Sequence, residues 1–282
     1  GLIGRTAGVR NIVWNVRNTE IPQGHLSMTG LIIKLCAVIS GWLPKAVICC
    51  AHAGLEVHAA RGYKRQKMLV LPNGYDTHEW QPNGVGRCEI RRNYDLPSEA
   101  FVVGIVGRYD TLKGYDLFIE AAERIVKVMN NALFIMIGRN VDDSNVELRS
   151  LIKSRGGDAT FRLFGERSDV AQLMSTMDVF CLTSKAEGFP NVVAEAMLMR
   201  VPCVVTNVGD AARIVGSTGV VVPSGNPTKF AEAVKILESK GAEWRKAAGE
   251  AARQHIVNNY SIDLISKNYE QLYEDIREEK RR

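Results

Sequence analysis

Residues 101–137 read FVVGIVGRYDTLKGYDLFIEAAERIVKVMNNALFIMI, and this stretch decides the fold class. Its two apolar runs, at 101–106 and 132–137, are rich in β-branched side chains and predict strands, whereas residues 115–128 between them predict a helix. The alternation continues, with strands expected at 160–164, 179–182, 203–205 and 219–222, and helices at 147–154, 170–174, 190–199 and 228–237. This pattern predicts an α/β fold with a doubly wound parallel sheet.

A shorter series of the same kind precedes this block. Strands are expected at 11–16, 46–50 and 68–71, with helices near 26–40 and 54–62, which look like the second half of another α/β domain. The turn-forming segments PNGYD (72–76) and WQPNG (80–84) separate the two series. We therefore predict an incomplete N-terminal domain at residues 1–75, a C-terminal domain at 76–258 and a terminal helix at 259–282.

The composition is that of a globular protein, with 46% hydrophobic and 24% charged residues in a chain of 282. The longest apolar run, residues 31–43, is interrupted by Lys34 and is shorter than the ~20 residues that span a bilayer. The chain starts at Gly1 without a signal-peptide pattern, so a truncated start is expected. Six cysteines without a C-x-x-C pair suit reduced thiols and a cytoplasmic location.

Positive charge is concentrated at the start of the chain. Residues 1–72 hold nine Lys or Arg against two Glu, a net +7, so the remainder of this +5 protein carries −2. Such a basic portion is suited to an anionic membrane surface, a phosphorylated acceptor or nucleic acid, and ordinary solvated faces are an equal alternative.

The segment EGFPNVVAEAMLM (187–199) carries two acidic residues at the start of a predicted helix. Pro190 suits the first turn, where free amides and the helix dipole attract anionic oxygens. Glu195 is the only polar residue from 192 to 199, so its carboxylate needs a partner, and a ribose diol would satisfy it. Glu187 could meet other hydroxyls of the same ligand. Alternatively, Glu195 pairs with a buried base or backbone amides, and Glu187 is only an acid favoured by the dipole.

The segment GIVGRYDTLKG (104–114) follows a predicted strand and holds two cations, Arg108 and Lys113. Ligands of open α/β sheets bind at such strand ends, so these side chains could neutralise a diphosphate. Two solvated loop cations are the alternative. A dinucleotide fingerprint is weakened by Asp110, which occupies the position of its third glycine.

Together these motifs resemble the family-4 retaining glycosyltransferases of the GT-B fold, which contains two Rossmann-like domains. The resemblance rests on Gly107-Arg108 with Lys113-Gly114, on Gly138, on Gly165 with Asp169, and on Ser184-x-x-Glu187-Gly188-Phe189-Pro190-Asn191 with Glu195. VLPNGYD (70–76) is similar to the family's interdomain segment and TNVGD (206–210) to the loop after a late strand. The resemblance covers residues 10–260 and implies that the N-terminal domain is incomplete.

The resemblance also implies roles for individual residues. Arg108 and Lys113 would bind the donor diphosphate, Glu195 the ribose and Glu187 the transferred sugar, so Glu187, Arg108 and Lys113 are the expected catalytic residues. The expected substrate-binding residues are Gly107, Arg108, Lys113, Gly138, Glu166, Arg167, Glu187, Gly188, Phe189, Pro190, Asn191, Val192 and Glu195. No metal and no cofactor are expected, since the nucleotide-sugar is a co-substrate and cations stabilise the leaving group.

The implied reaction transfers a sugar, with retention, from a nucleoside-diphosphate sugar to an acceptor. A lipid-linked glycan in surface polysaccharide or lipopolysaccharide synthesis is the expected acceptor, with peripheral contact at the inner face of the cell membrane and no nucleic-acid partner. One departure is WNVRNT (14–19), where many relatives place a histidine and this chain has Arg17 and Asn18. Two alternatives stay open: an epimerase of the same fold and a non-catalytic binding module. The incomplete chain could also be inactive alone. An NAD-dependent oxidoreductase would need a complete glycine fingerprint.

Overall fold

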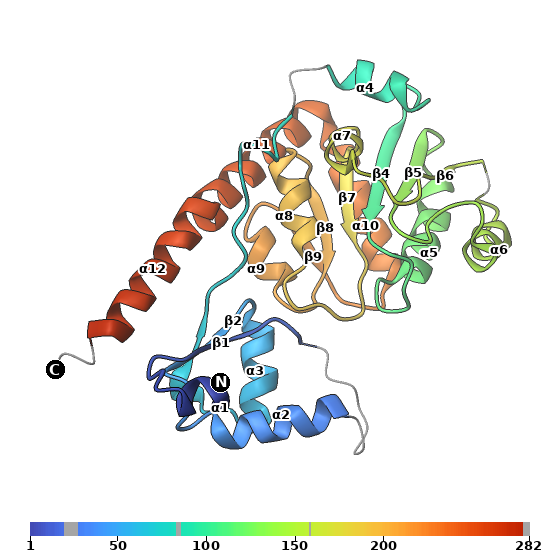
Figure 1. The fold of residues 1–282 in the computed structure, drawn as a ribbon. Helices are drawn as coiled ribbons and strands as arrows, with labels where there is room; N and C mark the ends of the chain where they lie inside the picture. The colour runs from blue at the N-terminus through green and yellow to red at the C-terminus, as the bar shows by residue number, and fades with distance from the viewer. Residues whose placement is uncertain (20–27, 83–85, 158, 279–282) are drawn as a thin grey trace. The chain divides into compact units, whose positions relative to one another are not determined.

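The computed structural model describes residues 1–19, 28–82, 86–157 and 159–278 (Figure 1). The chain forms two compact units. Unit 1 consists of Gly1–Tyr75, Glu187–Phe189 and Tyr260–Arg282, and unit 2 of Asp76–Ala186 and Pro190–Asn259. Each unit contains its own parallel sheet, as the alternation of strands and helices predicts.

Unit 2 is built on a six-stranded parallel sheet with the order β6-β5-β4-β7-β8-β9. The strands are β4 (Phe101–Val106), β5 (Ala132–Ile137), β6 (Phe161–Leu163), β7 (Val179–Leu182), β8 (Cys203–Thr206) and β9 (Val220–Val222). Strands β4 and β5 pair along their whole length, and all six residues of β5 are buried because helices cover both faces. The chain leaves β4 in one direction and returns through β7 in the other, so a topological switch point lies between these two strands.

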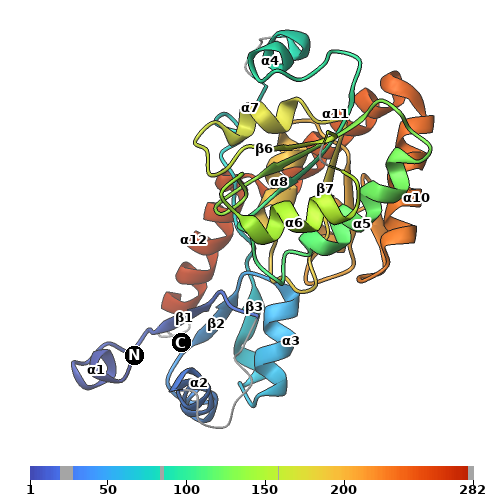
Figure 2. The ribbon, with the colours of Figure 1, turned by 90° about the vertical axis from the view of Figure 1, so that its right-hand side faces the viewer.

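The helices of unit 2 lie on both faces of this sheet (Figures 1 and 2). They are α4 (Arg87–Asn93), α5 (Tyr115–Val126), α6 (Val146–Ser154), α7 (Val170–Ser175), α8 (Asn191–Leu198), α9 (Ala211–Val215), α10 (Pro227–Ser239) and α11 (Gly241–Tyr260). Phe118 on α5 and Phe230 on α10 enter one core with strand residues such as Phe134. The rigid core holds the loops that follow the strands in fixed positions.

Unit 1 has a three-stranded parallel sheet, β1-β2-β3, formed by Val13–Val16, Ala46–Cys49 and Met68–Val70. Its helices are α1 (Leu2–Thr6), α2 (Met28–Ile39), α3 (His52–Ala60) and α12 (Ile262–Glu278). Tyr75 bridges to the start of α12: its amide donates to the Tyr260 carbonyl at 2.9 Å, and its carbonyl accepts from the Ile262 amide at 2.8 Å. None of the helices in the described ranges is long and apolar enough to cross a membrane.

Every strand that the sequence predicts is present, within two residues at each end. Three short helices, α1, α4 and α9, were not predicted. Helix α8 begins at Asn191, with Pro190 as its N-cap, rather than at Pro190 itself. Parts of three predictions lie outside the described residues: 26 and 27 of the predicted helix 26–40, 83 and 84 of the turn segment, and 279–282 of the terminal helix.

Candidate functional site

The loops that follow the strands of unit 2 meet at the carboxyl edge of its sheet, next to the switch point, and backbone hydrogen bonds join them. The Gly107 amide donates to the Ile137 carbonyl at 2.9 Å, and the Gly138 amide to the Gly165 carbonyl at 2.8 Å. Gly138 has a φ of 148° and lies so close to the Gly107 carbonyl that a Cβ atom would overlap it. Only glycine fits there, so Gly138 lets the loops after β4 and β5 pack backbone against backbone.

Both predicted cations lie in the loop between β4 and α5. Arg108 is exposed and donates from Nε to Asp110 at 3.1 Å. Asp110 also accepts from the Leu112 amide at 2.9 Å, which is the leading cause of its lowered pKa. The stem of Lys113 passes over Gly107 and would lie 3.7 to 3.9 Å from a Cβ atom there. The structure therefore places Arg108, Lys113 and Gly107 within one loop at the strand end.

This loop is locked to the one that follows β7. Gly114 has a φ of 67°, and a Cβ atom there would overlap the Thr183 carbonyl, so a side chain is excluded. The Thr183 hydroxyl donates to the Lys113 carbonyl at 3.1 Å, and the Lys185 amide donates to the Leu112 carbonyl at 2.8 Å. The backbone that carries Lys113 is thus held from both sides.

Thr206, at the end of β8, is a positioning residue that the sequence did not single out as such. Its buried hydroxyl is 2.8 Å from the Ser184 carbonyl and 3.2 Å from the Leu182 carbonyl. It fixes the start of the loop between β7 and α8. The available signal was a polar residue that ends an otherwise apolar strand.

Glu195 projects from α8, whose residues Val193, Ala194, Ala196, Met197 and Leu198 are all buried. Its own side chain is half-buried, and burial raises its pKa from 4.5 to about 7. Within the described ranges, no group donates a hydrogen bond to its carboxylate or forms an ion pair with it. The alternative in which a protein base or backbone amide satisfies Glu195 is therefore not observed among these residues.

The first turn of α8 holds other predicted residues. Pro190 is the N-cap, and its carbonyl accepts from the Val193 amide at 3.1 Å. Asn191 and Val192 follow as the first helical residues. Amide groups at this end of a helix lack acceptors within the helix and favour anionic ligands.

Glu166 and Arg167 lie in the turn after β6. Glu166 is exposed. Arg167 forms a two-pronged ion pair with Asp169, with contacts of 2.6 and 2.7 Å, and lies over the ring of Tyr94. The Tyr94 hydroxyl donates to the same carboxylate at 2.7 Å, so Arg167 belongs to an ordered cluster.

Glu187, Gly188 and Phe189 belong to unit 1. There, a Cβ atom on Gly188 would lie 2.7 Å from the Thr19 hydroxyl, and Phe189 packs on Tyr260 with ring centroids 5.7 Å apart. The other predicted site residues, from Gly107 to Arg167 and from Pro190 to Glu195, are gathered in unit 2. In the described part of the chain, no group of three or more His, Cys, Asp and Glu side chains is placed to hold a metal ion.

Cations and a half-buried carboxylate that has no partner among the described residues, at the carboxyl edge of a doubly wound parallel sheet, are typical of nucleotide-binding α/β proteins. The model of the family Glycosyl transferases group 1 matches residues 86–255. The chain belongs to this family. This membership confirms the assignment to the glycosyltransferases from the motifs, whereas the narrower assignment to retaining family 4 stays a prediction.

Similar proteins agree with this assignment. The chain is 24% identical over 98% of its length to the UDP-Gal:alpha-D-GlcNAc-diphosphoundecaprenol alpha-1,3-galactosyltransferase of Escherichia coli, of which it spans 73%. It is 28% identical over 74% of its length to the capsular polysaccharide biosynthesis glycosyltransferase CapM of Staphylococcus aureus, of which it spans 56%. Among solved structures, Alr3699/HepE of Anabaena in complex with UDP matches with a TM-score of 0.86 and 21% identity, over 97% of this chain and 74% of that one. These likenesses confirm the predicted GT-B fold.

Proposed function

We propose that the carboxyl edge of the unit 2 sheet binds a nucleoside-diphosphate sugar. The observation that carries this proposal is Glu195, a half-buried carboxylate without a partner among the described residues and with a raised pKa. Leaving a buried carboxylate unpaired costs free energy, and the two hydroxyl groups of a ribose can each donate a hydrogen bond to a carboxylate oxygen. Arg108 and Lys113 lie in a loop of the same edge and supply positive charge for the diphosphate.

We propose the following roles for the other predicted site residues. Gly107 and Gly138 border the ligand, and the amides of Asn191 and Val192 at the start of α8 lie near the phosphates. Glu166 and Arg167 border the base. Glu187, together with Gly188 and Phe189, contacts the transferred sugar.

The reaction that we propose is transfer of the sugar to an acceptor with retention of configuration. Arg108, Lys113 and the α8 amides stabilise the negative charge that develops on the leaving diphosphate, so the chemistry needs neither a metal ion nor a cofactor. The E. coli relative is named for a diphosphoundecaprenol acceptor and the S. aureus relative for capsular polysaccharide biosynthesis. We propose that the acceptor of this protein is also a lipid-linked glycan, in surface polysaccharide or lipopolysaccharide synthesis.

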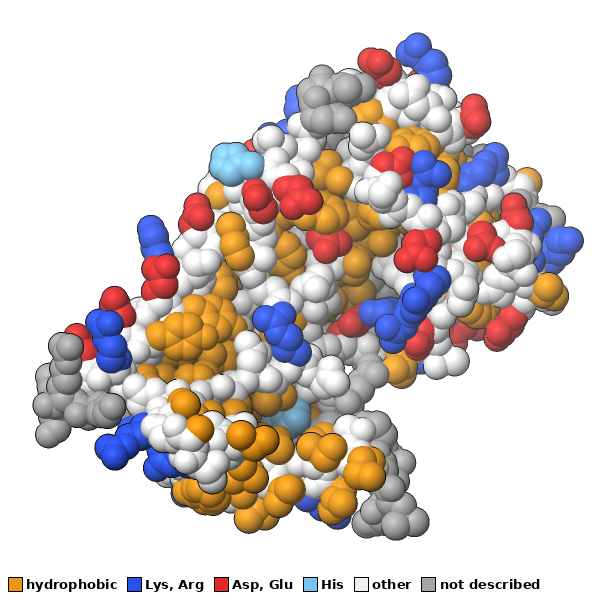
Figure 3. Space-filling model, in the orientation of Figure 1, with side chains coloured by type: hydrophobic (Ala, Val, Ile, Leu, Met, Phe, Trp, Pro, Cys, Tyr) orange, Lys and Arg blue, Asp and Glu red, His pale blue; other side chains and the backbone are white. Residues whose placement is uncertain are grey.

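We also propose peripheral contact with the inner face of the cell membrane through unit 1. One face of α2 exposes large apolar side chains, among them Leu31 (65% exposed), Leu35 (56%) and Val38 (76%). Figure 3 shows apolar side chains gathered over this helix. The excess of Lys and Arg in the same portion of the chain adds attraction to anionic lipid. Co-sedimentation with anionic vesicles should decrease for Leu35→Gln, whereas equal binding of the variant would exclude α2 as the contact.

Calorimetry tests the donor site directly. We expect UDP, GDP or ADP to bind the chain, whereas NAD does not, and we expect Glu195→Ala to weaken nucleotide binding more than Glu187→Ala does. The physical reason is that Glu195 contacts the nucleotide itself, whereas Glu187 contacts the sugar. The reverse order of the two variants would refute the ribose assignment. For the reaction, product analysis with a labelled nucleotide-sugar and a lipid-linked acceptor separates transfer from epimerisation or hydrolysis.

A further inference from the structure

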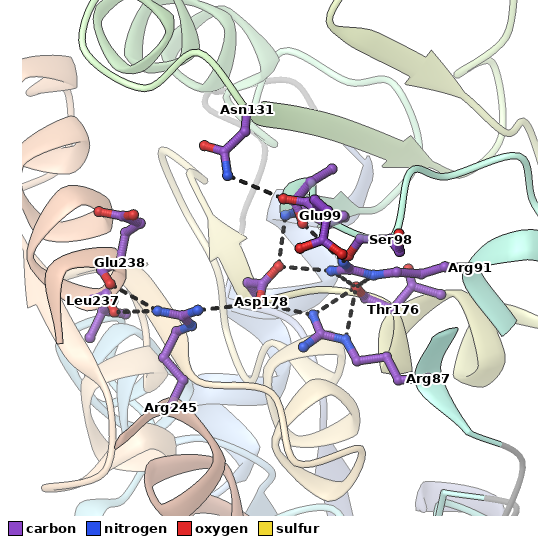
Figure 4. Close-up of polar contacts among 12 residues, drawn as sticks. Arg87, Arg91, Ser98, Glu99, Asn131, Thr176, Asp178, Leu237, Glu238 and Arg245 are labelled. Carbon is purple, nitrogen blue, oxygen red and sulfur yellow. Dashed lines mark hydrogen bonds and ion pairs between the residues drawn. The ribbon is translucent and has the colours of Figure 1, made fainter. Parts of the chain in front are cut away.

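A second charged cluster lies at the amino edge of the unit 2 sheet, opposite the edge that carries Arg108 and Lys113. Its centre is Asp178, which directly precedes β7. Three guanidinium groups converge on its carboxylate (Figure 4): Arg91 at 2.8 Å, Arg87 at 3.1 Å and Arg245 at 3.7 Å. The Val102 amide also donates to Asp178 at 2.8 Å, so one carboxylate faces three guanidinium groups and one backbone amide.

The charges in this cluster do not balance. Arg91 is 5% exposed, Asp178 8% and Arg245 14%, so little water reaches them, and the three cations face one anion. Backbone carbonyls accept the remaining bonds: Thr176 accepts from Arg87 and Arg91 at 2.8 Å each, and Leu237 and Glu238 accept from Arg245. Carbonyl dipoles satisfy hydrogen bonds but do not neutralise two excess positive charges.

Two donors of the cluster are unused within the described ranges. Nε of Arg245 is buried and has no hydrogen-bond partner there. Arg87 uses Nε and Nη2 for Thr176 and Asp178, which leaves its Nη1 without a partner among these residues, and this side chain is 42% exposed. An arginine donor without an acceptor is costly, and an anion from solution can reach Nη1 of Arg87, whose side chain is partly exposed, whereas Nε of Arg245 is closed to solvent.

Arg87 and Arg245 help to line a pocket of about 370 Å³. Arg200 and Lys246 line it as well, against Asp178 and Glu243 as the only acidic lining residues among those described. The lining therefore carries a formal net charge of +2. Arg200 is paired with Glu250 at 2.5 Å, whereas Lys246 has no hydrogen bond or ion pair with any described residue.

We propose that this pocket, which we call the arginine pocket, binds a phosphate group with two negative charges. The planar fork of a guanidinium matches phosphate oxygens, and Lys246 adds a mobile point charge to the lining. A dianion neutralises the +2 lining, which a chloride or a single carboxylate does not. Because the pocket lies at the amino ends of the strands, this site is separate from the donor site. It does not depend on the proposed function.

The ligand also has a structural consequence. The arginine pocket joins α4, which carries Arg87 and Arg91, to α11, which carries Arg245, through Asp178 at the start of β7. A bound phosphate group would bridge these elements and stabilise unit 2 by mass action.

Titration calorimetry with inorganic phosphate, in low-salt buffer with chloride-matched controls, tests the proposal. We expect Arg87→Gln to weaken binding about tenfold and Lys246→Gln about threefold, because the first contact is more buried. Lys153→Gln on α6, an exposed lysine outside the pocket lining, is the matched control and should bind like the unmodified protein. Arg108→Gln should leave unchanged the phosphate binding that depends on Arg87 and Lys246, which separates the arginine pocket from the donor site.

Three outcomes would overturn the proposal: no binding of either inorganic phosphate or vesicles that contain phosphatidic acid, binding that Arg87→Gln and Lys246→Gln leave intact, or binding that only Arg108→Gln abolishes. Lys246 is exposed and has no described contact, so Lys246→Gln keeps the test valid even if Arg87→Gln unfolds. Vesicles that contain phosphatidic acid form a second arm of the experiment. Binding to these vesicles that depends on Arg87 and Lys246, without binding of inorganic phosphate, would support the site and assign it to a lipid headgroup.

Discussion

Glu195→Gln should stabilise the ligand-free protein, and only at neutral and alkaline pH. Burial raises the pKa of Glu195 from 4.5 to about 7, so the folded state disfavours the ionised carboxylate. Below pH 4.5 the group is neutral in both the folded and the unfolded state, and the penalty grows as the pH rises to 7. A shift of this size corresponds to at most ~3 kcal/mol, and we expect ~2 kcal/mol because the side chain is only half-buried.

Urea unfolding of unit 2 at pH 5 and at pH 8 measures this effect. The difference in unfolding free energy between Glu195→Gln and the unmodified protein should increase by ~2 kcal/mol from pH 5 to pH 8. Glu99→Gln is the control, because Glu99 is exposed in the loop before β4 and should give a difference near zero at both pH values. A Glu195→Gln variant that is less stable at pH 8 would show that the carboxylate has a partner in the folded protein, and the ribose assignment would lose its basis.

Two further predictions concern the loops and the arginine pocket. Gly114→Ala should destabilise unit 2 by more than ~2 kcal/mol and weaken nucleotide binding, because the new Cβ overlaps the Thr183 carbonyl. The control is Gly225→Ala, which should cost only ~1 kcal/mol because Gly225 has a φ of 74° but open space around it. Equal losses of unfolding free energy in the two variants would contradict this reasoning. Asp178→Asn should lower the unfolding free energy by ~3 kcal/mol, because three guanidiniums then face a neutral amide. Millimolar phosphate should restore part of that loss in denaturant titrations, whereas no recovery would contradict the proposed anion site.

The strands of both sheets could be predicted to within two residues because their apolar runs are buried and bounded by turn formers. Helix α4 could not be predicted, because its segment RCEIRRN contains few apolar residues. The Arg91 side chain of this helix donates to the carbonyls of residues 98, 100 and 176. Such stabilisation comes from tertiary contacts, which a local pattern does not contain.

The same division applies to the site. The positions of Arg108 and Lys113 after a strand, and of Glu195 in the helix that follows a neighbouring strand, could be predicted from the sequence, because parallel strands place their carboxyl ends at one edge. The cluster of Arg167 with Asp169 and Tyr94 could not be predicted from the sequence, because Tyr94 is distant from the other two residues along the chain. The convergence of three arginines on Asp178 is equally invisible in sequence, because it joins residues from 87 to 245.

Nucleotide binding should release protons, and this release tests the role of Glu195 more sharply than affinity alone. If the ribose hydroxyls donate to the ionised carboxylate, binding lowers the pKa of Glu195 from about 7, so a part of the population must lose a proton near neutral pH. Affinity should then fall below pH 7 in the unmodified protein and change less in Glu195→Gln.

Calorimetry in two buffers of different ionisation enthalpy counts the released protons, and phosphate buffer is avoided because it would occupy the arginine pocket. The diphosphate titrates as well, so the informative quantity is the difference between the unmodified protein and Glu195→Gln. Equal proton release by both would mean that Glu195 stays protonated in the complex. The carboxylate would then accept no ribose hydroxyl as an anion, and its burial in α8 would serve the fold rather than the ligand.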